Sequence, residues 1–226
     1  MIIGLDPGHG GADAGGNKGT FIEKHMNLYV ALKVKTLLQG KLQIFMTRET
    51  DVTVSLTDRS KMLNKANTDF NVSIHHNAAD GKAKGFEIYY YTGSKIGKTL
   101  AEAVGTEFAL SRPKRFIGSG MMVGTVPGDY WMLRATNAPT ILTEYGFVDN
   151  PTEQKEMNLD KEAIEIATAI LKFTHLNTET DEILLRRLAE KGVIKNTDYW
   201  LGVLGGSPLS PEYLRILMRN ALNLID

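Results

Sequence analysis

Four ionisable side chains stand where short apolar segments of the chain end, and a fifth lies in the connection after the first segment. His9 follows the first of these segments, and Glu23 lies in the connection after it. His75 and His76 close a second segment, FNVSIHH, and Glu144 closes a third, TILTE. Imidazole and carboxylate groups are typical ligands of catalytic zinc, which binds three protein side chains and keeps a fourth position for water. The residue types therefore predict hydrolysis of an amide by water that a metal ion activates.

The glycines around His9 favour a metal ion over a nucleotide. A glycine-rich turn after a strand often binds phosphate, and here the turn reads GLDPGHGGADAGG. The dinucleotide pattern needs a third glycine where Asp13 stands, and the Gly-Lys-Ser/Thr of a P-loop is missing. The carboxylate of Asp13 would also repel a pyrophosphate. We therefore expect the glycines to let the backbone and one ligand approach a compact ion.

The sequence alone leaves open the role of Glu23 and the choice between His75 and His76. Thr20 and Glu23 form the pattern T-x-x-E of a capping box, in which the glutamate only caps backbone N–H groups. Successive strand side chains face opposite ways, so at most one of His75 and His76 reaches the site. The alternation of side chains along the strand places His75 on the side of its polar neighbours and His76 on the side of its apolar ones. A parallel strand can be buried on both faces, so this alternation does not decide which histidine reaches the site.

Glu144 is the carboxylate left over after metal binding. A carboxylate beside the metal suits the transfer of a proton from water to the departing amine. The zincin layout is excluded, because the chain has no H-E-x-x-H segment. Asn77 shares the parity of His75 and is predicted either to bind substrate or to form a turn. Arg48 and Arg59 are expected to pair with acids and to support the structure.

The segments that carry these residues alternate between strand and helix patterns. The predicted strands are Met1–Leu5, Leu42–Thr47, Asp69–His75, Gly85–Thr92 and Thr140–Glu144. The predicted helices are Lys24–Gln39, Ser55–Asn67, Ile96–Leu110 and Lys161–His175. This alternation predicts an α/β domain with a largely parallel, twisted sheet flanked by helices. The carboxyl ends of such strands share one edge of the sheet, which would bring His9, His75 and Glu144 together.

Composition excludes several classes of protein. The chain has 226 residues with 26 basic and 26 acidic side chains, so no overall field attracts nucleic acid or an anionic membrane surface. It has no cysteine, which excludes disulfides, thiolate ligands and a cysteine nucleophile. No segment reaches the roughly 20 apolar residues of a membrane span, and the first residues lack the pattern of a signal peptide. We expect synthesis in the cytoplasm without an export signal.

The motifs resemble those of the zinc-dependent N-acetylmuramoyl-L-alanine amidases of the amidase-3 type, a family that includes bacterial autolysins and phage endolysins. The similarity runs in order through GLDPGHGGADAG, IEKHMNL, MTRETD, LTDRSKMLNKANTDFNVSIHHNAA and APTILTEYGFVDNP. The resemblance implies that His9, Glu23 and His75 bind one Zn²⁺ and that Glu144 is the catalytic glutamate. His76 stands where the family more often has a small residue.

The resemblance also implies the substrate. It is the amide between the lactyl group of N-acetylmuramic acid and L-alanine in peptidoglycan, cleaved after the protein reaches the cell wall. Glu144 would take a proton from zinc-bound water and return it to the alanine nitrogen. We expect a phage endolysin first and a bacterial autolysin second. Another zinc peptidase or deacetylase of the cell wall, and a non-catalytic peptidoglycan-binding protein, are the alternatives.

The last part of the chain predicts a second, smaller domain. The polar segment HLNTETDE predicts a boundary near residue 177, with a zinc amidase domain at 1–176 and an all-helical domain at 177–226. Thr180 and Ser210 are predicted to cap its helices. A unit of this length is only marginally stable by itself. We therefore expect it to recognise a cell-wall polymer or to self-associate.

Overall fold

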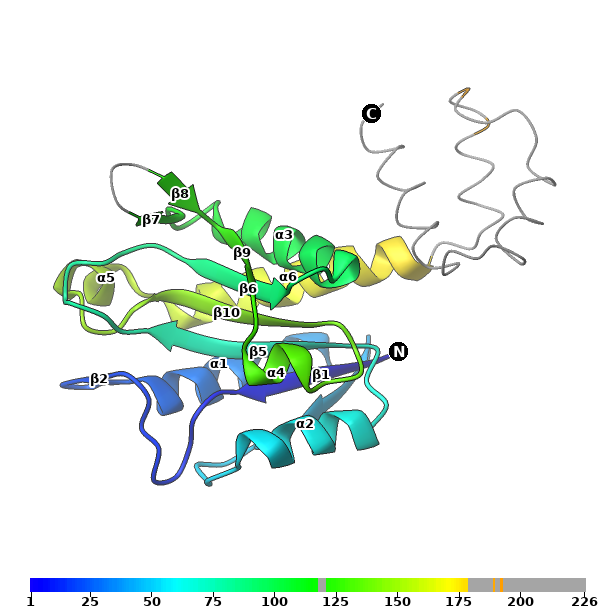
Figure 1. Ribbon diagram of the computed structural model, residues 1–226, viewed down its shortest axis with the longest axis horizontal. Coiled ribbons are helices and arrows are strands. Elements are labelled where there is room, and N and C mark those ends of the chain that lie inside the picture. Colours follow the sequence, from blue (N-terminus) through cyan, green and yellow to red (C-terminus); the bar gives the residue numbers. More distant parts are fainter. Residues whose placement is uncertain (118–120, 179–188, 190–191, 193–226) are drawn as a thin grey trace. The chain divides into compact units, whose positions relative to one another are not determined.

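A central sheet of six strands positions the candidate residues (Figure 1). The computed structural model describes residues 1–117, 121–178, 189 and 192. The strands lie in the order β4-β1-β5-β10-β6-β9. Their bounds are β1 (Ile2–Pro7), β4 (Gln43–Met46), β5 (Phe70–Asn77), β6 (Glu87–Tyr91), β9 (Thr125–Gly128) and β10 (Thr140–Phe147). Only the pair of β10 and β6 is antiparallel among these six, which confirms the expected, largely parallel sheet.

Six helices and two short strand pairs complete the described part of the chain. The helices are α1 (Glu23–Leu38), α2 (Leu56–Lys65), α3 (Lys95–Phe108), α4 (Trp131–Arg134), α5 (Pro151–Glu156) and α6 (Leu159–Thr178). The short pairs are β2 (Asn17–Lys18) with β3 (Phe21–Ile22), and β7 (Arg115–Ile117) with β8 (Met121–Val123). All strands and helices predicted between residues 1 and 175 are present, with small shifts at their ends. The sequence patterns did not predict β9, α4, α5 or the short strand pairs.

Helices cover both faces of the sheet (Figure 1). On one face, the ring of Tyr145 in β10 packs against Phe108 of α3, and its hydroxyl donates to Glu165 of α6. On the other face, Arg59 of α2 reaches Asp6 of β1, and α4 packs against β10 and β6. Consecutive side chains of each central strand therefore face different layers, as the alternation of a strand requires.

The central strand β5 is buried on both faces, and this explains its mixed composition. Val72 and Ile74 are fully buried on one face, while Asn71 and Ser73 are fully buried on the other. The two polar side chains have partners, because Ser73 donates to Asp6 over 2.7 Å and Asn71 donates to a threonine hydroxyl over 2.9 Å. Polarity along β5 therefore marks a buried polar layer and not an exposed face.

Arg59 and Arg48 stabilise the ends of the strands in different ways. Arg59 forms an ion pair with Asp6 over 2.8 Å, with both side chains buried, as the sequence predicted. Arg48 instead donates to the backbone carbonyls of Pro7 and Gly8, over 2.8 Å each. The expectation that Arg48 pairs with an acid is therefore wrong. Its guanidinium satisfies carbonyls that the sharp turn after β1 leaves without a strand partner.

The chain divides into two compact units between Ile170 and Leu171, inside α6. The first unit carries the whole sheet and all candidate site residues. Helix α6 continues to Thr178, past its predicted end at His175. The predicted helices of 177–226, with Thr180 and Ser210 as caps, lie outside the described residues. Among the described helices, none combines the length and apolar character needed to cross a membrane.

Candidate metal centre

The turn after β1 brings His9 back toward the sheet by means of glycines. His9 itself has a left-handed backbone with φ of 59°. A Cβ atom on Gly8 would lie 2.0 Å from the ring of His75, and one on Gly15 would lie 2.5 Å from the carboxylate of Glu23. Any side chain at these two positions would collide with a candidate ligand. The glycines therefore permit the close approach that the sequence predicted.

His9, Glu23 and His75 converge at the carboxyl ends of β1 and β5. Glu23 Oε1 lies 3.1 Å from His9 Nε2 and 2.9 Å from His75 Nδ1. One ligand atom from each of the three residues lies within 4.8 Å of the other two. Two imidazoles and one carboxylate, each partly or fully buried, form the donor set of many catalytic zinc sites. The residues present therefore fit a single divalent cation.

A carboxylate outside the ligand set orients His9. Asp13 Oδ2 lies 2.8 Å from His9 Nδ1, so the other ring nitrogen, Nε2, faces Glu23. A carboxylate bound to the distal nitrogen of a ligating histidine fixes its tautomer and raises its basicity. Burial disfavours the charged ring, but Glu23 and Asp13 outweigh this effect and raise the pKa of His9 to about 8. A metal ion must displace that proton in order to bind.

Glu23 is held as a carboxylate. Burial alone would raise its pKa, but the hydrogen bonds and charges of His75 and His9 lower it well below the usual range. The backbone N–H of Gly16 donates to Oε2 over 2.7 Å, and that of His76 donates to Oε1 over 3.2 Å. The capping-box interpretation is wrong, because α1 begins at Glu23 and its N-cap, Ile22, makes no side-chain hydrogen bond. The carboxylate therefore faces the histidines.

His75 and His76 have separate environments, which resolves the choice that parity left open. His75 lies at the candidate centre, whereas His76 is 1% exposed on the opposite face of β5. Its Nδ1 lies 2.8 Å from the amide oxygen of Asn27 in α1, and its Nε2 lies 2.9 Å from Glu162 in α6. His76 therefore ties two helices to the sheet.

Glu144 stands beside the three candidate ligands. It pairs with His75 in the register of β10 and β5, so the two side chains share a face. Its Oε2 atom is buried and has no hydrogen-bond partner within the described residues. Burial, and then the charges of Glu23 and Glu87, raise the pKa of Glu144 well above its usual value, and Arg115 opposes them. Burial and the two neighbouring carboxylates therefore favour the protonated form of this carboxyl group.

Sequence reasoning missed two residues of this cluster, Glu87 and Arg115. Glu87 pairs with Glu144 in the register of β6 and β10 and is 1% exposed. It forms an ion pair with Arg115 and accepts a hydrogen bond of 3.1 Å from Asn77 Nδ2. The alternation of the segment GFEIYY could have assigned Glu87 to one face of its strand, but the register that places it beside Glu144 comes from the fold. The partner Arg115 comes from a short strand that no pattern indicated.

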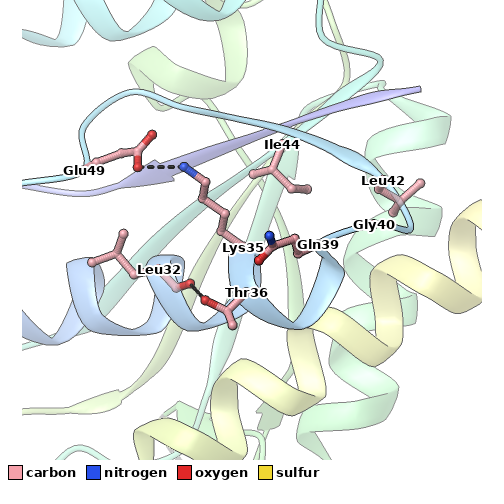
Figure 2. Close-up of a pocket in the computed structure, with 8 residues that line it drawn as sticks. All are labelled: Leu32, Lys35, Thr36, Gln39, Gly40, Leu42, Ile44 and Glu49. Atoms are coloured by element: carbon pink, nitrogen blue, oxygen red, sulfur yellow. Dashed lines mark hydrogen bonds and ion pairs between the residues drawn. The ribbon is translucent and has the colours of Figure 1, made fainter.

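Two hollows in the surface differ in the chemistry of their walls. One, of about 310 Å³, is lined by His9, Asp13, Leu56, His75 and their neighbours. The other is larger, about 410 Å³, and lies between α1 and the edge strand β4 (Figure 2). Its one acid, Glu49, is paired with Lys35 over 2.6 Å, and it contains no histidine. The smaller hollow is therefore the candidate active site, because two of the three converging ligands, His9 and His75, line it.

The fold and the site define a class of protein. It is an α/β protein in which two histidines and a glutamate at the strand ends form a candidate site for one metal ion. The chain belongs to the N-acetylmuramoyl-L-alanine amidase family Amidase_3, whose model matches residues 3–174. This match covers the sheet, all candidate ligands and Glu144. It ends before the predicted second domain.

Known amidases and an endolysin are similar to this chain over most of its length. The amidase CwlM of Bacillus licheniformis is 34% identical over 156 residues, which cover 68% of this chain and 59% of CwlM. The endolysin of Bacillus phage SPP1 is 32% identical over 170 residues, 74% of this chain and 62% of the endolysin. A crystal structure of an N-acetylmuramoyl-L-alanine amidase from Clostridium difficile 630 is 32% identical, with a TM-score of 0.68, over 79% of this chain and 98% of that one.

Proposed function

We propose that this chain is a zinc-dependent amidase that hydrolyses the bond between the lactyl group of N-acetylmuramic acid and L-alanine in peptidoglycan. The observation that carries the proposal is the convergence of His9, Glu23 and His75 beside the buried carboxyl group of Glu144. Membership of the N-acetylmuramoyl-L-alanine amidase family supports the choice of bond. The relatives support action on the bacterial cell wall, because they include a phage endolysin and a bacterial amidase at similar identity.

His9, Glu23 and His75 would hold the zinc ion, with Asp13 orienting His9. When bound, zinc supplies a Lewis acid that polarises the scissile carbonyl and makes water nucleophilic near neutral pH. The chain itself supplies the fixed geometry. The glycines at 8 and 15 leave space for the ligands, and the backbone N–H groups of Gly16 and His76 hold the carboxylate of Glu23.

Glu144 moves the proton in this proposal. It accepts a proton from the attacking water and donates it to the nitrogen of the departing L-alanine, so the amide leaves as an amine. Burial, Glu23 and Glu87 raise its pKa, and a cation bound at the neighbouring ligands would lower that pKa. One carboxyl group can serve in both steps, because it accepts the proton as a carboxylate and returns it as an acid.

Asn77 is proposed as a substrate contact next to the reacting groups. Its Nδ2 donates to Glu87 and its Oδ1 accepts from the N–H of Ala78, so the side chain is fixed. One amide hydrogen of Nδ2 is still available to a carbonyl of the substrate. The predicted domain at 177–226 is proposed to bind a cell-wall polymer or a second copy of the chain.

Identification of the bond that the protein cleaves in cell walls tests this function. Purified cell walls are digested with the unaltered protein, and the new chain ends are identified by amino-terminal labelling. We expect free amino-terminal L-alanine, no acetate and no new reducing sugar ends. Acetate would indicate a deacetylase, and a different new amino terminus would indicate a peptidase. Binding to the walls without any new ends would indicate a non-catalytic protein, and each of these results contradicts the proposal.

A further inference from the structure

Aromatic side chains continue the face of the sheet that carries Glu144. We define the aromatic patch as Tyr89 of β6, Tyr130 and Trp131, the last two at the start of α4. Tyr89 follows Glu87 by two residues on the same strand, and Glu87 pairs with Glu144. Alternate strand residues share a face, so Tyr89 lies on the face of Glu87 and Glu144, about 7 Å further along the strand.

The patch is exposed, although its rings are held in place from below. The side chains of Tyr130 and Trp131 are 47% and 37% exposed. The rings of Tyr89 and Tyr130 meet edge to face with centroids 4.8 Å apart. A Cβ atom on Gly128 would lie 3.2 Å from one ring and 3.3 Å from the other, so a glycine there allows this packing. The indole N–H of Trp131 donates to Ser60 over 3.3 Å.

Tyr89 makes the patch continuous with the candidate active site. Burial, and then the neighbouring carboxylate of Glu87 and the phenol of Tyr130, raise the pKa of the Tyr89 phenol. Tyr89 thus lies between Glu87, two residues earlier on the same face of β6, and the exposed ring of Tyr130, which its own ring contacts. A ligand that reaches from Glu144 along β6 would meet these rings next.

The chemistry of the patch favours a neutral sugar over a charged peptide. The guanidinium of Arg134 lies 5.3 Å from the centroid of the Trp131 ring, and its charge is paired with Asp129 over 3.2 Å. Large exposed apolar patches on soluble proteins mark binding sites. A sugar ring offers C–H groups to aromatic faces and hydroxyl groups to phenols, which matches rings that carry a polar tip.

We infer that the aromatic patch binds the glycan part of the substrate, with the sugar ring that bears the scissile amide, or the next sugar, lying on Tyr130. The inference rests on the proposed amidase function, in which a sugar lies directly beside the bond at Glu144. The stem peptide, which carries carboxylates, then extends away from the patch. Tyr130 is a specificity-determining residue in this arrangement, since it contacts substrate and not the reacting atoms.

A comparison of two substrates tests the subsite. One is a soluble muropeptide with a disaccharide, and the other is the same stem peptide acylated by lactate alone. The kcat/KM of each is measured for the unaltered protein and for Tyr130→Ala. We expect the ratio of glycan-bearing to sugar-free kcat/KM to fall about ten-fold in the variant, mainly through KM. Tyr130→Trp should restore the ratio because it restores a ring.

The control is Tyr29→Ala, which removes a ring of 46% exposure from α1 and should leave the ratio unchanged. If Tyr130→Ala does not fold, Tyr130→Leu keeps the apolar volume without the ring and should show the same fall. An unchanged ratio, or an equal fall in the control, overturns the inference. A changed oligomeric state with an unchanged ratio would make the patch a protein interface and would also overturn it. If the unaltered protein cleaves neither substrate, the proposed function itself fails.

Discussion

At the scale of single residues, the proposed chemistry depends on a few side chains that glycines allow to meet. The meeting of His9, Glu144 and one of the two adjacent histidines could be predicted from the sequence, because each follows a β-rich segment and strand ends share an edge. Strand alternation alone did not decide between His75 and His76. The role of Glu23 could not be derived in this way, since its position also fits a capping box. Glu87 escaped prediction because its role is visible only through the strand register that places it beside Glu144.

Glu144→Gln tests the proton carrier. The amide keeps the size of the side chain but cannot accept a proton from water, so we expect the release of amino-terminal alanine to fall about 10³-fold. Zinc content should stay at one ion per chain, because Glu144 is not a proposed ligand. Both quantities are measured on the same preparations, and the exposed Glu102→Gln is the control. A variant that keeps its activity would remove Glu144 from the mechanism.

Asp13→Asn tests the residue that orients His9. Loss of the carboxylate at Nδ1 removes its support for the ligating tautomer, so we expect zinc affinity to fall about 10- to 100-fold. A competition titration against a chelator of known affinity measures the change. Asp80→Asn, which removes an exposed carboxylate elsewhere, should leave the affinity as it is. Equal affinities for Asp13→Asn and the unaltered protein would contradict the assigned contact.

At the scale of elements, hydrophobic periodicity predicted the central strands and the long helices. It failed between residues 112 and 139, where β9 and α4 are short and pair or pack with distant segments. Four-residue elements contain too little of a period to be recognised, and their partners come from the tertiary fold. The polar residues of β5 also did not indicate an exposed face. Asn71 and Ser73 are buried, and their hydrogen-bond partners come from other strands of the fold.

His76→Ala tests the connection between β5, α1 and α6. The substitution leaves Glu162 buried without its partner, so we expect the free energy of unfolding to fall by about 3 kcal/mol. Urea unfolding followed by circular dichroism measures the change. His25→Ala removes a largely exposed imidazole and should alter the value by less than about 0.5 kcal/mol. Similar effects of both variants would contradict the structural role of His76.

Asp6→Asn tests the buried ion pair under the strand ends, and its effect depends on pH. Burial alone would raise the pKa of Asp6, but Arg59 and the hydroxyls of Thr47 and Ser73 lower it below the usual 3.8. A lowered carboxyl pKa stabilises the fold above about pH 4, and this stabilisation is lost as the pH falls through the folded-state pKa.

We therefore expect the unaltered protein to exceed Asp6→Asn by about 3 kcal/mol in unfolding free energy between pH 5 and 8. The difference should shrink below about pH 4, because Asp6 is protonated first in the unfolded chain and only at lower pH in the folded protein. Urea titrations at several pH values measure it, with Asp58→Asn, an exposed neighbour of Arg59, as control. A difference that grows on acidification would contradict the direction of the shift.

At the scale of the whole molecule, catalysis and wall recognition are proposed to lie in different parts of the chain. The family match ends at residue 174 and the first compact unit ends at Ile170. We expect a fragment of residues 1–178 to cleave a soluble muropeptide as fast as the full chain. Its adsorption to purified walls, measured by co-sedimentation, should be weaker. A fragment that pellets equally well would contradict a wall-binding role for 177–226.

Zinc-dependent recovery of activity tests the central claim most directly. The full chain is stripped of metal with a chelator, its metal content is verified, and zinc is added back stepwise while free amino-terminal L-alanine is measured. We predict no release from the stripped protein and full recovery at one zinc per chain, with no recovery in His75→Ala at that ratio. Undiminished alanine release from a preparation shown to be free of metal would contradict the claim.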